Sequence, residues 1–266
     1  MRFASLGSGS QGNGTLIQTP NTVLMVDCGF PRKEAEARML ALGVDPGQLD
    51  ALLVTHEHSD HCAGITALSS AHNIPVYLSH GTARHKKLAG CARQVRFNAG
   101  EGFSVGDIQV TSVPVPHDAR EPVQYRLATP DTVLGILTDL GSITPHVVAA
   151  FSGCHALLLE FNHDRKLLQA GPYPATLKQR VGGDYGHLNN EQASELLAQI
   201  DTSKLRILVA GHLSQQNNTA EHTRAALDSV RDLHQAAVFI ASQDLGFDWL
   251  CPSEPFDVSG FAAVAT

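Results

Sequence analysis

The densest group of chemically active side chains in this sequence places four potential metal ligands within six residues. Residues 55–61 read THEHSDH, and the ligands are His56, His58, Asp60 and His61. Alternate residues of an extended chain point to the same side, so His56 and His58 are expected to share one cation. Asp60 and His61, at the entrance of a following helix, are expected to turn toward a second cation about 3.5–4 Å from the first.

Three further residues of the same types follow other predicted strands. His117 comes after residues 110–115, Asp139 after 133–137 and His212 after 205–209. Side chains at strand ends can converge, an aspartate can bridge two metals through its two oxygens, and neutral imidazoles add no charge.

Asp27 stands in the same way after the apolar run 23–26. We expect it to accept a hydrogen bond from a ligating histidine and so to orient that ring. A simple turn-forming aspartate is the alternative interpretation. Cys62, next to His61, is expected to be a small packed side chain.

Short apolar runs, many of them β-branched, predict the buried strands that position these residues. The runs are 16–17, 23–26, 51–54, 75–78, 108–113, 133–137, 156–159, 205–209 and 238–240. Helical patterns lie between them, and alternation of so many strands with helices predicts two packed sheets with helical layers.

Three helices have recognisable starts. Residues 187–200 carry a capping box formed by Asn189 and Gln192. A second helix begins at Thr144-Pro145 and ends at Gly153. Thr219 is expected to cap a third, in which Leu227, Val230 and Leu233 face the core.

The composition is that of an ordinary soluble protein with one large domain. Of 266 residues, 43% are apolar and 17% charged. We expect one domain over residues 1–251 and a C-terminal tail over residues 252–266. No apolar run approaches the ~20 residues of a membrane helix, and residues 1–7 lack the apolar core of a secretory signal. Contact with a membrane is therefore not expected.

Cysteine usage and charge restrict the setting and the partners. The five cysteines are scattered and form no C-x-x-C pair, which favours a reducing, cytoplasmic compartment. The net charge of −7 excludes an overall basic footprint, so any contact with nucleic acid has to be local.

The ordered set of ligands resembles the metallo-β-lactamase superfamily: a T-H-x-H-x-D-H cluster, then a histidine, an aspartate and a final histidine. The opening 6–14 and the segments EFNHD (160–164), GHLNN (186–190) and GHLSQQNN (211–218) are similar to the YycJ-like branch, whose members are associated with DNA exonuclease activity. This resemblance implies an α+β fold, a four-layer αββα sandwich with metals at one edge between the sheets. The family's opening loop usually has Ser or Thr where this chain has Gly14.

The resemblance also implies which residues hold two divalent ions, zinc, manganese or iron. It places His56, His58 and His117 on the first metal, Asp60, His61 and His212 on the second, and Asp139 between them.

Two divalent ions that share a water turn it into hydroxide near neutral pH, which suits attack on a phosphodiester. The leaving oxygen then needs a proton. His187 is the candidate donor because related tRNA-processing endonucleases use a histidine in the corresponding position, and Glu160 is expected to orient it. Asp60, His187 and Glu160 are therefore the predicted catalytic residues. A structural role is the alternative for His187 and Glu160, and His163 either touches substrate or supports a ligand.

Phosphate binding is expected from Ser8, Ser10, Asn13 and the backbone amides of the glycine-rich 7–14 loop. This loop satisfies G-x-G-x-x-G, but the strand-like 15–17 follows where a dinucleotide fold demands a helix. A tight hairpin is the alternative explanation of its glycines.

Lys178 and Arg180, beside His187, are the predicted phosphate contacts, whereas the basic group at 84–96 is equally well explained as solvated surface. Aromatic residues for base stacking are sparse, with Phe97, Tyr173 and Tyr185 the candidates. We therefore expect single- or double-stranded DNA to be bound without sequence-specific readout. The sequence does not indicate an oligomeric state.

Two other classes of function share these ligands. A small-molecule thioester, lactone or cyclic-phosphate hydrolase would use the same hydroxide. A non-catalytic metal-binding or redox protein is the third possibility, although redox relatives usually replace a ligand histidine with glutamate and carry a flavin partner domain.

Overall fold

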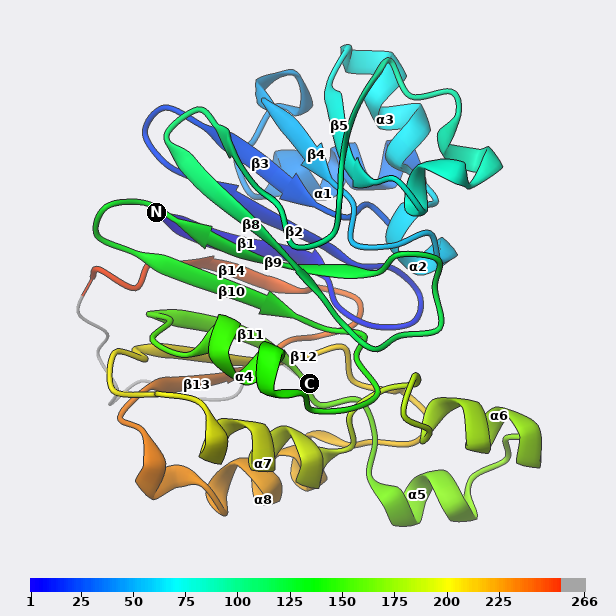
Figure 1. Cartoon of the computed structure of the whole chain (residues 1–266), viewed down its shortest axis with the longest axis vertical. Helices are drawn as coiled ribbons and strands as arrows, with labels where there is room; N and C mark the ends of the chain where they lie inside the picture. The colour runs from blue at the N-terminus through cyan, green and yellow to red at the C-terminus, as the bar shows by residue number, and fades with distance from the viewer. Residues whose placement is uncertain (255–266) are drawn as a thin grey trace.

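The computed structural model describes residues 1–254, which form two seven-stranded sheets packed face to face (Figure 1). The first sheet has the order β14 (Phe247–Leu250), β1 (Arg2–Gly7), β2 (Gly14–Gln18), β3 (Val23–Val26), β4 (Ala51–Leu53), β5 (Pro75–Ser79), β6 (Arg93–Phe97). The second has the order β13 (Ala237–Ile240), β12 (Ile207–Gly211), β11 (Ala156–Glu160), β10 (Val133–Leu137), β9 (Val123–Ala128), β8 (Ile108–Pro114), β7 (Gly102–Val105). From residue 255 onward, the predicted tail lies outside the described residues.

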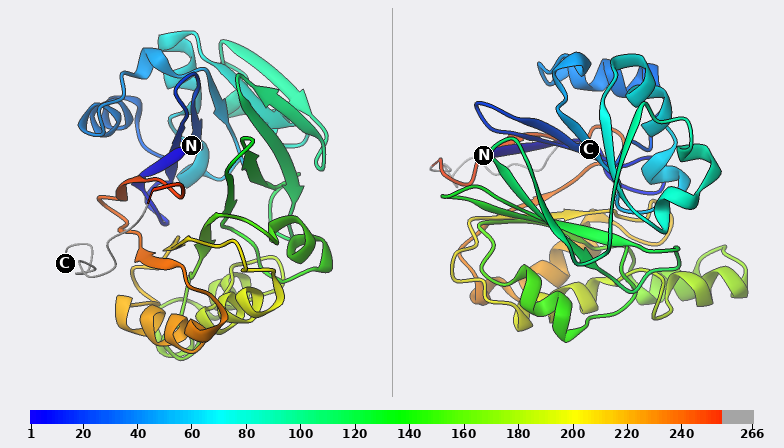
Figure 2. Two further views of the ribbon diagram at one scale, coloured as in Figure 1. Left: turned by 90° about the vertical axis from the view of Figure 1, so that its left-hand side faces the viewer. Right: turned by 45° about the horizontal axis from the view of Figure 1, so that its top comes forward.

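Helices cover the outer face of each sheet (Figures 1 and 2). The first sheet is covered by α1 (Arg32–Ala41) and α3 (Ile65–His72), the second by α4 (Pro145–Phe151), α7 (Asn190–Gln199) and α8 (Ala220–Asp228). The remaining helices are α2 (Ser59–Cys62), α5 (Arg165–Ala170), α6 (Ala175–Val181) and the short 3-10 turns η1 (Pro46–Gln48), η2 (Thr82–Arg84), η3 (Lys86–Leu88) and η4 (Arg231–Leu233). The predicted α+β, four-layer αββα sandwich is confirmed. No helix within residues 1–254 has the length and apolar character needed to cross a membrane.

Three apolar layers hold the sandwich together. The inner faces of the two sheets meet in a layer that includes Ile17, Leu53, Val110 and Leu158. Separate apolar clusters join each sheet to its own helices. Inside the inner layer, the Tyr125 hydroxyl donates to the Val54 carbonyl at 2.7 Å and so links the sheets next to the 56–61 segment. The site thus rests on a rigid frame.

The predicted strands are all present, and the one at 205–209 is shifted to Ile207–Gly211. The caps at Thr144, Asn189 and Thr219 each accept the expected backbone hydrogen bond. Two helix predictions were wrong in detail. The helix expected from His187 begins at Asn190, because Asn189 caps it, and Leu233 is 46% exposed, because α8 ends at Asp228 and the chain turns into η4.

The topology brings the carboxyl ends of several strands to one edge. β3 and β4 run parallel in the first sheet, and β10, β11 and β12 run parallel in the second. Asp27, Asp139 and His212, which follow β3, β10 and β12, have φ values of 60°, 53° and 55°. This left-handed conformation is costly for residues other than glycine, by about 1–3 kcal/mol, and such strain concentrates at functional sites.

Candidate metal centre

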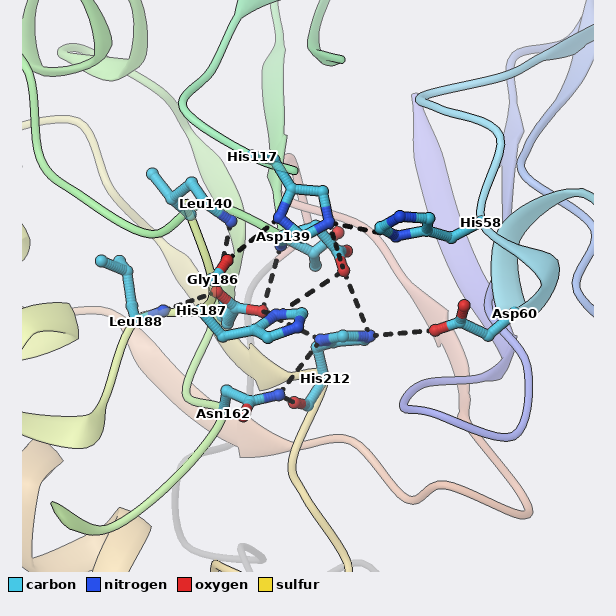
Figure 3. A network of polar contacts seen from close by, with 12 residues as sticks. His58, Asp60, His117, Asp139, Leu140, Asn162, Gly186, His187, Leu188 and His212 are labelled. Carbon is cyan, nitrogen blue, oxygen red and sulfur yellow. Dashed lines mark hydrogen bonds and ion pairs between the residues drawn. The ribbon is translucent and has the colours of Figure 1, made fainter. Parts of the chain in front are cut away.

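All seven predicted ligands converge at this shared edge of the two sheets. Figure 3 shows five of them, His58, Asp60, His117, Asp139 and His212. Ligand atoms of His56, His58 and His117 lie within 4.8 Å of one another. The same limit holds for Asp60 with His61 and His212, and for His56 with His61 and Asp139. The chain therefore carries candidate metal-binding clusters of histidine and aspartate, built from both sheets.

Two of the histidines in the first sheet are oriented through Asp27. The His61 Nδ1–H donates to Asp27 Oδ2 at 2.8 Å. The His56 Nδ1–H donates to the Thr55 hydroxyl at 3.0 Å, and that hydroxyl donates to Asp27 Oδ2 at 2.7 Å. Both rings thus turn Nε2 toward the cluster, and Asp27 stands where an orienting acceptor was expected.

The rings from the second sheet are oriented in the same manner. The His117 Nδ1–H donates to the Gly186 carbonyl at 3.0 Å, and the His212 Nδ1–H donates to Glu160 Oε1 at 2.9 Å. His58 is turned the other way, because its Nδ1 lies 3.3 Å from His117 Nε2 while its Nε2 faces Asp118 at 3.7 Å. His117 and His212 thus have Nε2 available for a cation, and His58 has Nδ1 available.

Several polar atoms of the cluster are buried without a hydrogen-bond partner, and they indicate whether these residues fit a metal ion. His56 Nε2, Asp139 Oδ2 and His212 Nε2 are buried without a hydrogen-bond partner. Such atoms are rare in folded proteins and call for a specific explanation, such as an ion. Nitrogen and carboxylate donors without thiolate suit zinc, manganese or iron. The donor set therefore fits a divalent cation.

The charges of the cluster favour positive charge between its carboxylates. Burial by itself would raise the pKa of Asp139, but His212 and His61 lower this pKa well below its ordinary range. Burial would lower the pKa of His212, but Asp139, Asp60 and Glu160 together raise it to about 10. The protonated His212 ring thus supplies positive charge beside Asp139, Asp60 and Glu160. A bound cation would supply the same charge.

Glu160 is a fully buried acceptor between His187 and His212, two residues that Figure 3 labels. Its Oε1 accepts from His187 Nδ1 and from His212 Nδ1, each at 2.9 Å. Its Oε2 accepts from the Leu188 amide at 2.9 Å. Although burial opposes ionisation, His187 and His212 lower the pKa of Glu160 to about 2. The carboxylate is therefore ionised at neutral pH.

A cavity of about 380 Å³ opens next to the cluster, and His187, Asp60 and Asp139 line it. Two residues expected to bind substrate, Ser10 and Arg180, also line this cavity. The Arg180 guanidinium forms an ion pair with the Asp118 carboxylate at the cavity wall.

Four other predicted substrate residues do not line the cavity. Ser8 Oγ accepts from the His212 amide at 2.9 Å, and Asn13 Nδ2 donates to the carbonyls of Gly9 and Asp60 at 3.0 and 3.2 Å. Lys178 Nζ donates to the Gln169 carbonyl at 2.5 Å. His163 is buried, with Nδ1 3.3 Å from Asn162 Oδ1. These side chains contact the protein itself.

The remaining candidates are distributed as follows. The basic residues of 84–96 belong to the η2–η3 region and to β6, away from the cavity lining. Phe97 is buried in the inner core and Tyr185 is 65% exposed, whereas Tyr173 lines the cavity. Cys62 is buried, as expected.

Residues that the sequence did not single out also take part. Asp118 faces His58, His117 and Arg180, and its place directly after a predicted ligand was the available signal. Asn162 lines the cavity and donates to the His212 carbonyl at 3.0 Å. The projecting pair α5–α6, visible in Figure 1, was not predicted as helical at all.

The fold and the ligand cluster define a metal-dependent hydrolase of the metallo-β-lactamase class. Residues 22–212 match the model of the Beta-lactamase superfamily domain, and the chain belongs to this superfamily.

Among its relatives, the chain is 33% identical over 234 residues to Exodeoxyribonuclease YycJ of Bacillus anthracis, covering 86% of this chain and 89% of the relative. It is also 33% identical over 241 residues to Exodeoxyribonuclease WalJ of Streptococcus pneumoniae, covering 88% and 89%. The predicted membership and hydrolase class are confirmed.

Solved structures show the same fold at low sequence identity. Zn²⁺-bound PqqB from Methylobacterium extorquens superimposes with a TM-score of 0.72 and 17% identity, covering 94% of this chain and 100% of the other. The metallo-β-lactamase fold protein YhfI from Bacillus subtilis gives 0.71 and 18%, with coverage of 94% and 99%.

Proposed function

We propose that this protein is a DNA exonuclease that hydrolyses phosphodiester bonds with two divalent ions. One observation carries the proposal: His187, whose ring is held by the buried Glu160, lines the same cavity as four of the seven potential ligands, His58, Asp60, Asp139 and His212. The relatives named as exodeoxyribonucleases support DNA as the substrate.

The proposed ligands divide into two sets that share one aspartate. His56, His58 and His117 hold one ion, Asp60, His61 and His212 hold the other, and Asp139 contributes to both. When bound, two divalent ions lower the pKa of water and neutralise the charge that develops on the phosphoryl group. Zinc, manganese and iron are the candidate metals.

His187 is the proposed proton donor for the leaving oxygen. Its Nδ1 is held by Glu160 at 2.9 Å, so Nε2 remains to carry the proton into the cavity. The Glu160 carboxylate accepts from His187 Nδ1–H and so fixes the direction of the ring. Asp60 Oδ2, 3.6 Å from His61 Nε2 and 3.7 Å from His212 Nε2, keeps both rings next to the reacting phosphate.

Substrate binding is assigned to the residues at the cavity wall. Arg180 exchanges Asp118 for a phosphate of the DNA, and Ser10 donates a hydrogen bond to the same backbone. Ser8, Asn13, His163 and Lys178 act indirectly, because their polar atoms bond within the protein. The cavity binds single- or double-stranded DNA without sequence readout. Five free cysteines are consistent with a cytoplasmic setting.

Labelled oligonucleotides test this function directly. Single- and double-stranded substrates with 5′-phosphate or 5′-hydroxyl ends are incubated with Mn²⁺ or Zn²⁺, alongside closed circular DNA. We expect mononucleotides released from one end of linear DNA and no cut in circles. His58→Ala and Asp139→Ala are expected to lose both bound metal and activity.

The same assay separates the alternatives. Cleavage of circular DNA would replace the exonuclease with an endonuclease. Absence of DNA degradation with either metal, together with turnover of a thioester, a lactone or bis-p-nitrophenyl phosphate, would replace it with a small-molecule hydrolase.

A further inference from the structure

Helix α6 buries none of its residues, yet it carries apolar side chains that face the catalytic cavity. Tyr173, Leu177 and Val181 recur at intervals of four, which places them along one side of a helix and its entrance. All three line the cavity, and all three are only partly buried. We call these three residues the apolar wall.

The apolar wall is held in a fixed relation to the reacting groups. α5 and α6 are inserted in the chain between Glu160 and His187 and project from the edge of the sandwich (Figure 1). The His187 amide donates to the Val181 carbonyl at 2.9 Å, so the helix end and the proposed proton donor are directly linked. The Arg180 ion pair with Asp118 ties the same turn to the metal cluster.

The rest of the cavity lining is polar and includes His58, Asp60, His187, Ser10 and Ser214. A ligand that satisfies this cavity therefore has one flat apolar part and one anionic part. At about 380 Å³, the space is near the lower limit for small-ligand pockets, which suits a single nucleotide.

We propose that the apolar wall binds the nucleobase of the terminal nucleotide, with the Tyr173 ring and Leu177 packed against the base while Arg180 contacts a phosphate. This inference rests on the proposed exonuclease function and adds the residues that bind the terminal nucleotide of the DNA. Packing against the face of a base accepts all four bases, because each has the same flat apolar surface. Tyr173 and Leu177 thus act in substrate binding and not in the chemical step.

A kinetic test uses DNA that lacks the terminal base. The degraded end is identified first, and an abasic analogue then replaces the nucleotide at that end. On normal DNA, Tyr173→Ala and Leu177→Ala are each expected to raise KM about tenfold with little change in kcat. Tyr173→Phe is expected to retain the KM of the unmodified protein.

The abasic substrate provides the decisive comparison. It is expected to raise KM about tenfold for the unmodified protein, and the two alanine variants are expected to add little further. Leu40→Ala removes a leucine that is 58% exposed on α1 and serves as the matched control, with KM unchanged.

A binding measurement without metal removes any dependence on turnover. An oligonucleotide ending in 2-aminopurine is titrated with protein in EDTA, because stacking quenches this base's fluorescence. The unmodified protein is expected to quench it, and Tyr173→Ala is expected not to do so.

The outcomes separate this inference from the proposed function. If the protein degrades normal and abasic ends with equal KM, or if both alanine variants match the unmodified protein, the inference is overturned while the exonuclease function stands. If no DNA is degraded and 2-aminopurine is not quenched, both are overturned.

Discussion

His187 and His212 share one oxygen of Glu160, although one is the proposed proton donor and the other a proposed ligand. His187 lies within 4.8 Å of Asp139 and His212 but belongs to neither of the two proposed ligand sets. Its replacement should therefore affect proton transfer and spare the metals. We predict that His187→Ala retains both ions by elemental analysis while kcat falls roughly 10²–10⁴-fold, the usual scale of general acid–base catalysis.

Glu160→Gln provides the companion variant. It keeps the shape of the side chain but removes the negative charge that His187 Nδ1–H faces, so the ring is held less firmly and kcat should fall in the same direction. An unchanged kcat in His187→Ala would remove this residue from the mechanism.

His163 gives a pH-dependent prediction. Burial is the main cause that lowers the pKa of His163 to about 4, from an ordinary value of 6.5. As the pH falls below 6.5, His163 becomes protonated in the unfolded chain but stays neutral in the folded protein. The free energy of unfolding therefore decreases until the pH reaches about 4. Between pH 7 and 5 this residue should cost about 2 kcal/mol of the free energy of unfolding.

Urea unfolding of the metal-loaded protein measures this effect. His163→Asn should lose about 2 kcal/mol less than the unmodified protein over the same interval, because the other histidines are common to both. Parallel losses would show that His163 is protonated equally in both states.

The convergence of the seven proposed ligands was predictable from sequence, because residue type, spacing and strand ends all indicated the same cluster. The contacts around them were not. Ser8 and Asn13 carry the donors that phosphate requires, but their burial and their bonds to His212, Gly9 and Asp60 depend on how distant segments meet. The partners of Asp118 could not be predicted from its place after His117, because His58 and Arg180 lie far away in the chain.

At the scale of elements, the inserted α5–α6 pair brings positive charge to the cavity. Arg180 lies on its cavity side, whereas Lys178 bonds to the Gln169 carbonyl. If Arg180 contacts one phosphate, Arg180→Ala should reduce the slope of log K against log salt by about 0.7–0.9. Fluorescence anisotropy with labelled DNA in EDTA, from low to moderate salt, measures this slope.

Arg224→Ala on α8 is the matched control, because Arg224 is exposed and does not line the cavity. Its slope should equal that of the unmodified protein. Equal slopes for Arg180→Ala would place the phosphate contact elsewhere.

Short apolar runs predicted most strands, but β1, β6, β7, β9 and β14, in which polar residues or glycine interrupt the apolar ones, were not predicted. β3, β11 and β12 are buried throughout, because helices cover one face and the opposite sheet covers the other. β6 and β7 lie at the edges of their sheets and retain exposed residues. Their short, polar sequences carry too few apolar positions to distinguish strand from loop.

At the scale of the whole molecule, bound metal should stabilise the fold, since the proposed ligands come from both sheets. An ion present at a thousand times its Kd adds about 4.1 kcal/mol to the free energy of unfolding. For a protein of this size that is a rise in Tm on the order of 10 °C. We predict that EDTA lowers Tm by this order and that Zn²⁺ or Mn²⁺ restores it, as measured by calorimetry.

His58→Ala should reduce this response and Leu40→Ala should leave it intact. The same Tm in EDTA and in added metal would contradict the proposed binding of cations between the sheets.

The division of the proposed ligands between two sheets also affects when the proposed centre can form during synthesis. His56, His58, Asp60 and His61 are made early, His117 and Asp139 near the middle, and His212 only after about four fifths of the chain. A ribosome-bound or truncated chain ending before residue 212 has no complete set of ligands. Such an unfinished chain is therefore expected to remain inert toward the DNA around it, and hydrolysis becomes possible only after the second half has docked against the first.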